Sequence, residues 1–151
     1  MPDMDLIDSL VATYRVLNHT VRQRPEVDLD RGEGSPRLII HDLRNDELHF
    51  SQNLKARISG QPVGLDDTEG RRDVGTAGLQ STTAELIAQF GTARESTLAM
   101  LRSLPDDQWD ISGDYPRSIR TEVFDLVARD RQVLDALGKA IGEPLTELAT
   151  A

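Results

Sequence analysis

The chain has 151 residues, with 26 acidic against 17 basic side chains and a formal net charge of −9. A field of that sign repels phosphate backbones and anionic lipid, so neither nucleic acid nor a membrane is expected as a partner. The absence of cysteine excludes disulfides, thiolate zinc sites and cysteine nucleophiles. No apolar run approaches the ~18 residues of a membrane span, and the N-terminus lacks the basic start of a signal peptide. We therefore expect a cytoplasmic protein.

The length is that of one domain, residues 1–151, which can bury a sizeable core without a disulfide or a metal. Aromatic residues make up only 4% of the chain, whereas the helix formers Leu, Ala, Arg and Glu are common. This composition favours an all-α fold over a sheet protein.

Apolar spacing predicts a first helix over residues 3–24, which Pro25 ends. Its buried face is expected to contain Leu6, Leu10, Tyr14, Leu17 and Val21. His19 lies off this face and is expected at the surface. Residues 26–34 are acidic, contain glycine and show no period, which predicts a loop.

A second helix is predicted over residues 35–58, with Ser35 as its N-cap, Pro36 at its first position and Gly60 beyond its end. Its apolar stripe is Ile39, Leu43, Phe50, Leu54 and Ile58. Glu47 falls inside this stripe. A carboxylate among core positions needs a partner, or it holds its proton. Glu47 therefore either ties two helices together or belongs to a pocket.

Residues 61–76 are polar and aperiodic, which indicates a long crossover or a lid over a pocket. A third helix then begins at a capping box formed by Thr82 and Glu85, and it ends before Pro105. Its expected stripe is Leu86, Phe90, Ala93, Thr97, Leu101 and Leu104. Gly91 within this helix indicates close packing against a neighbour.

The link that follows carries Trp109 and Tyr115, which we interpret as apolar plugs at one end of the fold rather than as a ligand cage. A fourth helix is predicted over residues 118–140, with Gly142 as its stop. Its stripe is Ile119, Val123, Leu126, Val127, Val133, Leu134, Leu137 and Ile141. Asp130 lies in the middle of that stripe.

Glu47 and Asp130 therefore both face the predicted core. Two inward carboxylates can serve as acid and base or as metal ligands. Otherwise their mutual repulsion in a dry interior demands protons or cations.

Several short motifs are spread over nearly the whole chain. They are Ser35-Pro36 at the entry to the second helix, Asp-Leu-Arg-Asn-Asp-Glu at residues 42–47, Leu104-Pro105 followed by Trp109, and Arg-Asp-Arg-Gln-Val at residues 129–133. In their placement the chain resembles the DinB superfamily of four-helix bundles, whose second helix reads His-Leu-x-Asp-x-Glu and whose last helix reads His-x-x-x-His. The resemblance implies a four-helix bundle with a long crossover between helices two and three.

The resemblance also implies a nickel or zinc ion held by three histidines, at the positions of Asp42, Arg129 and Val133. None of these is histidine, although a shift of one residue would make His41 the first ligand. Valine has no donor atom and an arginine cation repels a divalent ion, so we expect no metal and no other cofactor. At ~100° per residue, Asp42 and Arg129 lie at stripe edges flanking a groove, and His41 lies farther out. We predict that Arg129 pairs with Asp42, with Glu47 as a second partner, in place of the metal; in the alternative, Arg129 reaches solvent.

The candidate groove residues are Asp42, Glu47, Arg129, Asp130 and His41, and no catalytic residue is assigned. The first functional hypothesis is a metal-free, non-catalytic protein that binds a small molecule or a protein in this groove. The alternative is an enzyme. The resemblance implies bacillithiol or mycothiol transferases and isomerases, including maleylpyruvate isomerases, here with an atypical metal site; metal-free acid/base catalysis by Glu47 and Asp130 is the other enzymatic route.

Leu48 and Phe124 lie outside their stripes. Large apolar side chains off the core face can form a contact between two copies, and the resembled family often dimerises. We therefore expect a homodimer.

Overall fold

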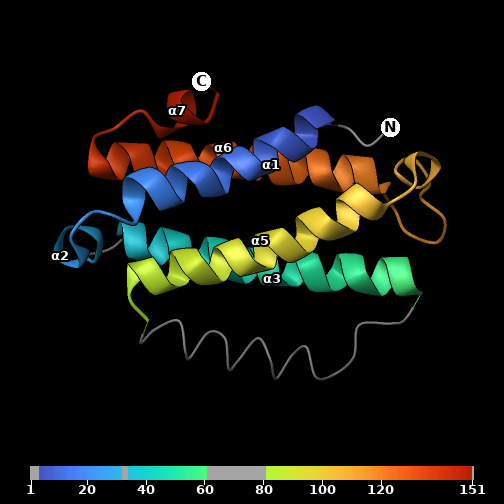
Figure 1. Ribbon diagram of the computed structural model, residues 1–151, viewed down its shortest axis with the longest axis horizontal. Coiled ribbons are helices and arrows are strands. Elements are labelled where there is room, and N and C mark those ends of the chain that lie inside the picture. The colour runs from blue at the N-terminus through green and yellow to red at the C-terminus, as the bar shows by residue number, and fades with distance from the viewer. Residues whose placement is uncertain (1–3, 32–33, 61–80, 151) are drawn as a thin grey trace.

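The computed structural model describes residues 4–31, 34–60 and 81–150, and every regular element in these ranges is a helix. Four long helices run along the longest axis (Figure 1): α1 (Met4–Val16), α3 (Pro36–Ser59), α5 (Thr83–Ser103) and α6 (Ile119–Ile141). The predicted all-α class is confirmed. The predicted crossover over residues 61–76 lies outside the described residues.

The long helices form two layers, with α1 beside α6 and α3 beside α5 (Figure 1). Each helix also contacts one helix of the other layer, because α1 packs on α5 and α3 packs on α6. This arrangement encloses one interior to which all four helices contribute. None of the described helices is long and apolar enough to cross a membrane.

The ends of α3 are set by the residues that the sequence predicts. The Ser35 side chain accepts a hydrogen bond from the Leu38 amide, and Gly60 adopts the left-handed conformation at the C-cap, with φ of 75°. The buried row is rotated from the predicted stripe and contains Ile40, Leu43, Arg44, Glu47, Ser51 and Leu54. Ile58, which was predicted to be buried, is exposed.

The first predicted helix is not α-helical throughout. After α1, residues Leu17–Val21 form one π-helical turn, in which the Arg22 amide donates to the Leu17 carbonyl at 2.9 Å. The wider turn still keeps Leu17 and Val21 in the core. His19 is exposed, as predicted.

The prediction of a loop over residues 26–34 is wrong at its start, where a short helix, α2 (Glu26–Leu29), follows directly after Pro25. Leu29 anchors α2 in the core. The Glu26 carboxylate accepts hydrogen bonds from the Thr83 amide at 3.0 and 3.1 Å, so α2 caps the first turn of α5.

Helix α5 begins at the predicted cap, where the Thr82 side chain accepts from the Glu85 amide, and all six residues of its predicted stripe are buried. Gly91 lies against the ring of Tyr14 on α1. A Cβ atom at this position would come within 2.4 Å of that ring, so the predicted close packing is confirmed.

Helix α6 is capped by Ser118, which accepts from the Thr121 amide, and it ends at Gly142 with φ of 78°. The chain then turns back as α7 (Leu145–Thr150), which the sequence analysis does not predict. α7 packs on α1 and α6 and inserts Leu145 into the core.

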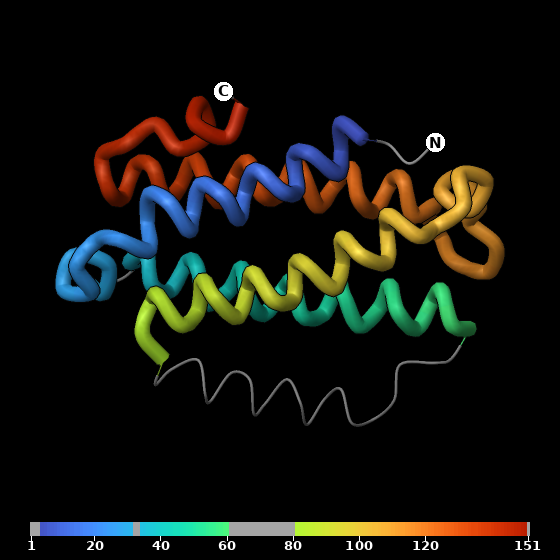
Figure 2. The backbone as a smooth tube through the Cα atoms, viewed as in Figure 1, coloured from blue at the N-terminus to red at the C-terminus, as the bar shows by residue number. Residues whose placement is uncertain are grey.

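The apolar core consists of two clusters of buried residues. One cluster includes Leu17, Ile40, Phe90 and Leu137, together with Leu29 of α2. The other includes Leu10, Leu101, Val123 and Trp109, and Trp109 directly follows the 3₁₀ turn η2 (Asp106–Gln108). Figure 2 shows that α2 and the link between α5 and α6 lie at opposite ends of the long helices.

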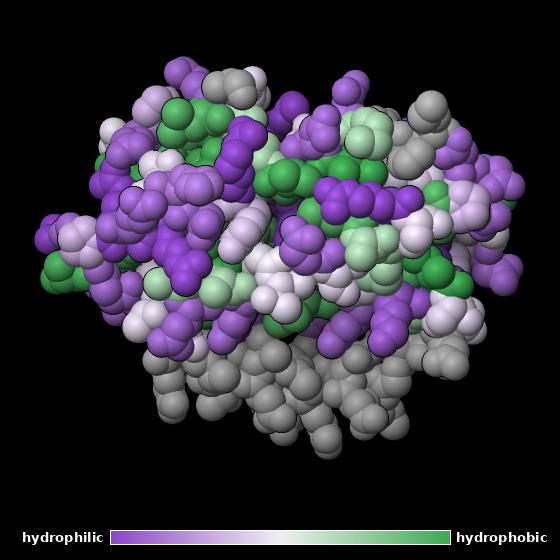
Figure 3. Space-filling model, in the orientation of Figure 1, coloured by the Kyte–Doolittle hydropathy of each residue, from purple (hydrophilic) through white to green (hydrophobic). Residues whose placement is uncertain are grey.

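Trp109 is fully buried and has the predicted plug role, whereas Tyr115 is nearly half exposed and is not a plug. Tyr115 instead supports the guanidinium of Arg57, which lies 4.3 Å from its ring centroid. Figure 3 shows one face of the molecule, on which hydrophilic side chains surround smaller groups of hydrophobic ones.

Candidate functional site

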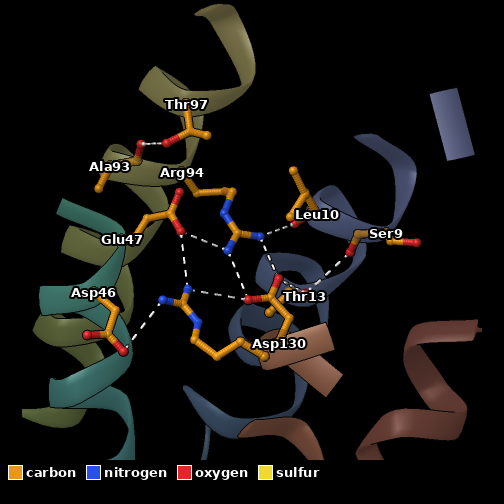
Figure 4. A network of polar contacts seen from close by, with 10 residues as sticks. Ser9, Leu10, Thr13, Asp46, Glu47, Ala93, Arg94, Thr97 and Asp130 are labelled. Carbon is orange, nitrogen blue, oxygen red and sulfur yellow. Dashed lines mark hydrogen bonds and ion pairs between the residues drawn. The ribbon is translucent and has the colours of Figure 1, made fainter. Parts of the chain in front are cut away.

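A buried network of charged side chains lies between the two apolar clusters (Figure 4). At its centre is Arg94 of α5, whose side chain is only 1% exposed. Arg94 Nη1 donates to Asp130 Oδ2 at 2.8 Å, and Nη2 donates to Asp130 Oδ1 at 3.1 Å. Nη2 also donates to Glu47 Oε1 at 2.9 Å. One guanidinium therefore joins the two inward carboxylates from α3 and α6.

Helix α1 completes this network with one side chain and one backbone carbonyl. Thr13 Oγ1 donates to Asp130 Oδ2 at 2.7 Å, and the Leu10 carbonyl accepts from Arg94 Nη1 at 2.8 Å. All four long helices thus supply a partner. Direct hydrogen bonds to the Arg94 guanidinium balance one of the two negative charges and so lower the free-energy cost of placing both carboxylates in a dry interior.

Burial by itself lowers the pKa of Arg94, but the charges and hydrogen bonds of Asp130 and Glu47 outweigh it and hold the pKa above the ordinary arginine value. Arg94 is therefore a permanent cation in the core. Its guanidinium also lies 4.8 Å from the ring centroid of Phe90, one turn earlier on α5.

Arg129 of α6 is a second cation at the edge of the network. Its Nη2 lies 3.6 Å from Glu47 Oε1 and 3.6 Å from Asp130 Oδ1, and its Nη1 lies 3.5 Å from Asp46 Oδ2. The predicted approach of Arg129 to Glu47 is confirmed. The predicted ion pair with Asp42 is wrong, because the outer carboxylate that Arg129 approaches belongs to Asp46.

Asp42 and His41 lie apart from this network. The Asp42 side chain is 80% exposed, and its polar contact within the described part of the chain is with the neighbouring His41 ring, with Oδ1 3.3 Å from Nδ1. The His41 side chain is only 13% exposed. His41 is therefore more buried than Asp42, whereas the sequence analysis predicts the opposite. The cause is the rotation of the buried row of α3 toward Ile40 and Arg44, which carries position 41 inward and position 42 outward.

The positions at which the resemblance implies metal ligands do not suit a metal ion. Asp42 is at the surface, Arg129 is a cation within 4 Å of both core carboxylates, and Val133 has no donor atom. Among the residues that the structure describes, no three His, Cys, Asp or Glu side chains cluster in a way that could hold a metal ion. The Glu47 and Asp130 oxygens nearest the centre already accept hydrogen bonds from Arg94.

Some polar atoms of the network are buried without a hydrogen-bond partner in the described parts of the chain, namely Glu47 Oε2, Arg94 Nε, and Nε and Nη2 of Arg129. The Arg129 contacts are longer than hydrogen bonds. Arg129 is therefore held by electrostatic attraction, while Arg94 is held by directed bonds.

Arg94 is the functional residue that the sequence analysis missed, although a signal for it exists. It falls one turn after Phe90 and one turn before Leu98, so it occupies an apolar position of the α5 stripe. The two inward carboxylates demand a cation, and a search for arginine at core spacing would have found it. The same search finds the buried Arg44, whose guanidinium donates to Asn45 and Gln89 and whose pKa is lowered by burial.

Comparisons of the chain with models of protein families, with curated proteins and with solved structures give no match.

Proposed function

We propose that the protein is a metal-free, non-catalytic binding protein built on a DinB-like four-helix bundle. The observation that supports this most strongly is the position of Arg94, whose guanidinium donates to both core carboxylates. Arg94 thus places a protein cation between inward carboxylates of α3 and α6, the two helices on which the resembled family carries its metal ligands. Together with Arg129, which lies 3.6 Å from both carboxylates, Arg94 supplies the two positive charges that balance Glu47 and Asp130.

The burial of the carboxylates argues against acid/base catalysis at this site. The Glu47 and Asp130 side chains are 0% and 3% exposed, and Thr13 and the Leu10 carbonyl fill the α1 side of the network. A general acid or base must come within hydrogen-bond reach of the proton that it transfers. A substrate would have to displace α1 or Arg129 to reach either group.

The DinB-like scaffold is proposed from the order and packing of the long helices. α3 enters through Ser35 and Pro36 and carries Glu47 inward, the link after α5 buries Trp109, and α6 carries Asp130 inward. These motif residues come from different helices and contribute to one interior, which supports the proposal. This support is independent of residues 61–80.

Metal analysis of protein purified without a histidine tag tests the proposal. We expect nickel and zinc well below one ion per chain, and no thermal stabilisation when either ion is added, because a ligand that binds the native state raises its apparent stability. The matched control is Asp42→Ala, which removes the exposed family-equivalent carboxylate and is expected to change nothing. Stoichiometric metal that disappears in Glu47→Gln or Asp130→Asn would overturn the proposal in favour of a thiol transferase or isomerase with an atypical site.

We also propose that the protein forms a homodimer through Phe124. This side chain is 63% exposed on α6, whereas Leu48, the other predicted contact, is partly buried on α3. Sedimentation velocity at micromolar concentration should show a dimer, and Phe124→Glu should yield a monomer because it places a charge in the contact. A monomeric unsubstituted protein would contradict this expectation.

A further inference from the structure

A pocket distinct from the ionic network lies where the C-terminal end of α3 meets the link between α5 and α6. Its volume is about 340 Å³, within the range of small-molecule sites. One wall is the last turn of α3, with Arg57 and Ile58, and the other is the link, with Ile111, Asp114 and Tyr115.

Several apolar side chains that line the pocket are exposed to solvent. Ile58, Ile111 and Tyr115 all line the pocket. Each is a large hydrophobic side chain, and each is nearly half exposed. Side chains of this type usually pack inside, so their convergence on one concave site indicates a surface that an apolar group can cover.

A directed positive charge lies at the same wall. The Arg57 guanidinium stacks on Tyr115 at 4.3 Å, and its Nη2 donates to the Ile111 carbonyl at 3.1 Å. These two contacts fix the orientation of the guanidinium but neutralise none of its charge. Among described residues, Arg57 has no carboxylate within ion-pair distance, so it can still accept one from a ligand.

A negative charge also lines the pocket. Asp114 follows Gly113, whose φ of 57° turns the link at this point, and Asp114 forms no ion pair with the described part of the chain. Arg57 and Asp114 therefore face one pocket as opposite charges that are more than 4.0 Å apart. Such an arrangement is complementary to a molecule that itself carries two separated opposite charges.

We infer that this pocket binds a small zwitterion with an apolar side chain, that is, a free hydrophobic α-amino acid. Its carboxylate pairs with Arg57, its ammonium group faces Asp114, and its side chain covers Ile58, Ile111 and Tyr115. This inference deepens the proposed binding function, on which it rests, by naming the site and the ligand class.

Calorimetric titration with L-phenylalanine tests the inference, and two analogues separate the charges. 3-Phenylpropionate lacks the ammonium group and phenethylamine lacks the carboxylate, so both should bind at least roughly tenfold more weakly than L-phenylalanine. Equal binding of either analogue would overturn the zwitterion assignment. The absence of any binding of L-phenylalanine up to about 10 mM would overturn the site.

Substitutions then locate the site. Arg57→Met and Asp114→Asn should each weaken L-phenylalanine binding by about tenfold or more, whereas Arg15→Met, a matched loss of an exposed arginine on α1, should leave it unchanged. Circular dichroism checks that each variant is folded. Binding that is unaffected by both pocket variants would overturn the assignment. Metal content is measured on the same samples, so a metal-free protein without amino-acid binding fails this inference alone, whereas stoichiometric metal fails the proposed function.

Discussion

Replacing Arg94 with methionine is expected to lower the free energy of unfolding by roughly 3–5 kcal/mol. Methionine retains most of the length of the side chain but removes the guanidinium that bonds to Asp130, Glu47 and the Leu10 carbonyl. Among the described residues, the two buried carboxylates would then keep the Thr13 hydrogen bond to Asp130 and the longer contacts to Arg129. For a chain of this length the loss corresponds to a fall in melting temperature of about 6–20 °C.

Urea denaturation with an unchanged m-value measures this effect. The matched control is Arg129→Met, whose side chain is 26% exposed and makes no hydrogen bond to the core carboxylates, so its cost should be much smaller. The triple substitution of Arg94, Glu47 and Asp130 by apolar residues should recover most of the loss, because it removes both buried carboxylates and Arg129 keeps its contact with Asp46. If Arg94→Met were as mild as Arg129→Met, the network would not contribute to stability in this way.

Truncating Trp109 to alanine is expected to cost about 3–5 kcal/mol, the usual range for a large buried aromatic side chain. Trp109 is fully buried in a cluster to which all four long helices contribute, and its carbonyl accepts from the Arg120 amide at 2.9 Å. The cavity left behind would open the end of the core at which α6 begins.

Two further variants check the cause of this loss. Trp109→Phe should be milder, because it keeps an aromatic ring and also removes the indole Nε1–H, a buried donor without a partner in the described structure. Tyr115→Ala, on the same link, should change stability little because that side chain is nearly half exposed. Equal effects of Trp109→Ala and Tyr115→Ala in a denaturation experiment would refute the plug role.

The long helices could be predicted because their boundaries depend on local chemistry. Ser35, Thr82 and Ser118 each accept a backbone hydrogen bond at a helix start, and Gly60 and Gly142 adopt positive φ at helix ends. These preferences act within a few residues of the chain and do not need the tertiary structure. The composition alone also favoured helix over sheet, and every regular element of the described residues is a helix.

The short elements could not be predicted, since tertiary contacts stabilise them. α2 has only four residues and is held by Leu29 in the core and by Glu26 at the start of α5. α7 is likewise anchored by Leu145 against α1 and α6. Helices this short have no intrinsic stability in water, so the sequence pattern carries little trace of them.

The candidate site was predicted in part. Glu47 and Asp130 were expected in the core and are found there, because each interrupts an otherwise apolar stripe. The sequence analysis predicts Arg129 as the cation that pairs with Glu47, whereas the main partner of both carboxylates is Arg94. Arg94 was missed because its position was not included in the buried stripe of α5. Asp42 was misplaced because the predicted stripe of α3 relied on Ile58, which lies at the exposed last turn.

The participation of all four long helices in one ionic network has a consequence for how the chain folds. If α3, α5 or α6 docked one turn out of place, its charged group would shift by about 5.4 Å and leave an unpaired ion in the apolar core. The same shift of α1 would remove the Thr13 and Leu10 hydrogen bonds. Misaligned and three-helix arrangements are therefore destabilised far more than they would be with a purely apolar core, in which a helix can shift along its axis at little cost. The network should therefore make folding cooperative, because the ion pairs form only when the helices that carry them pack together.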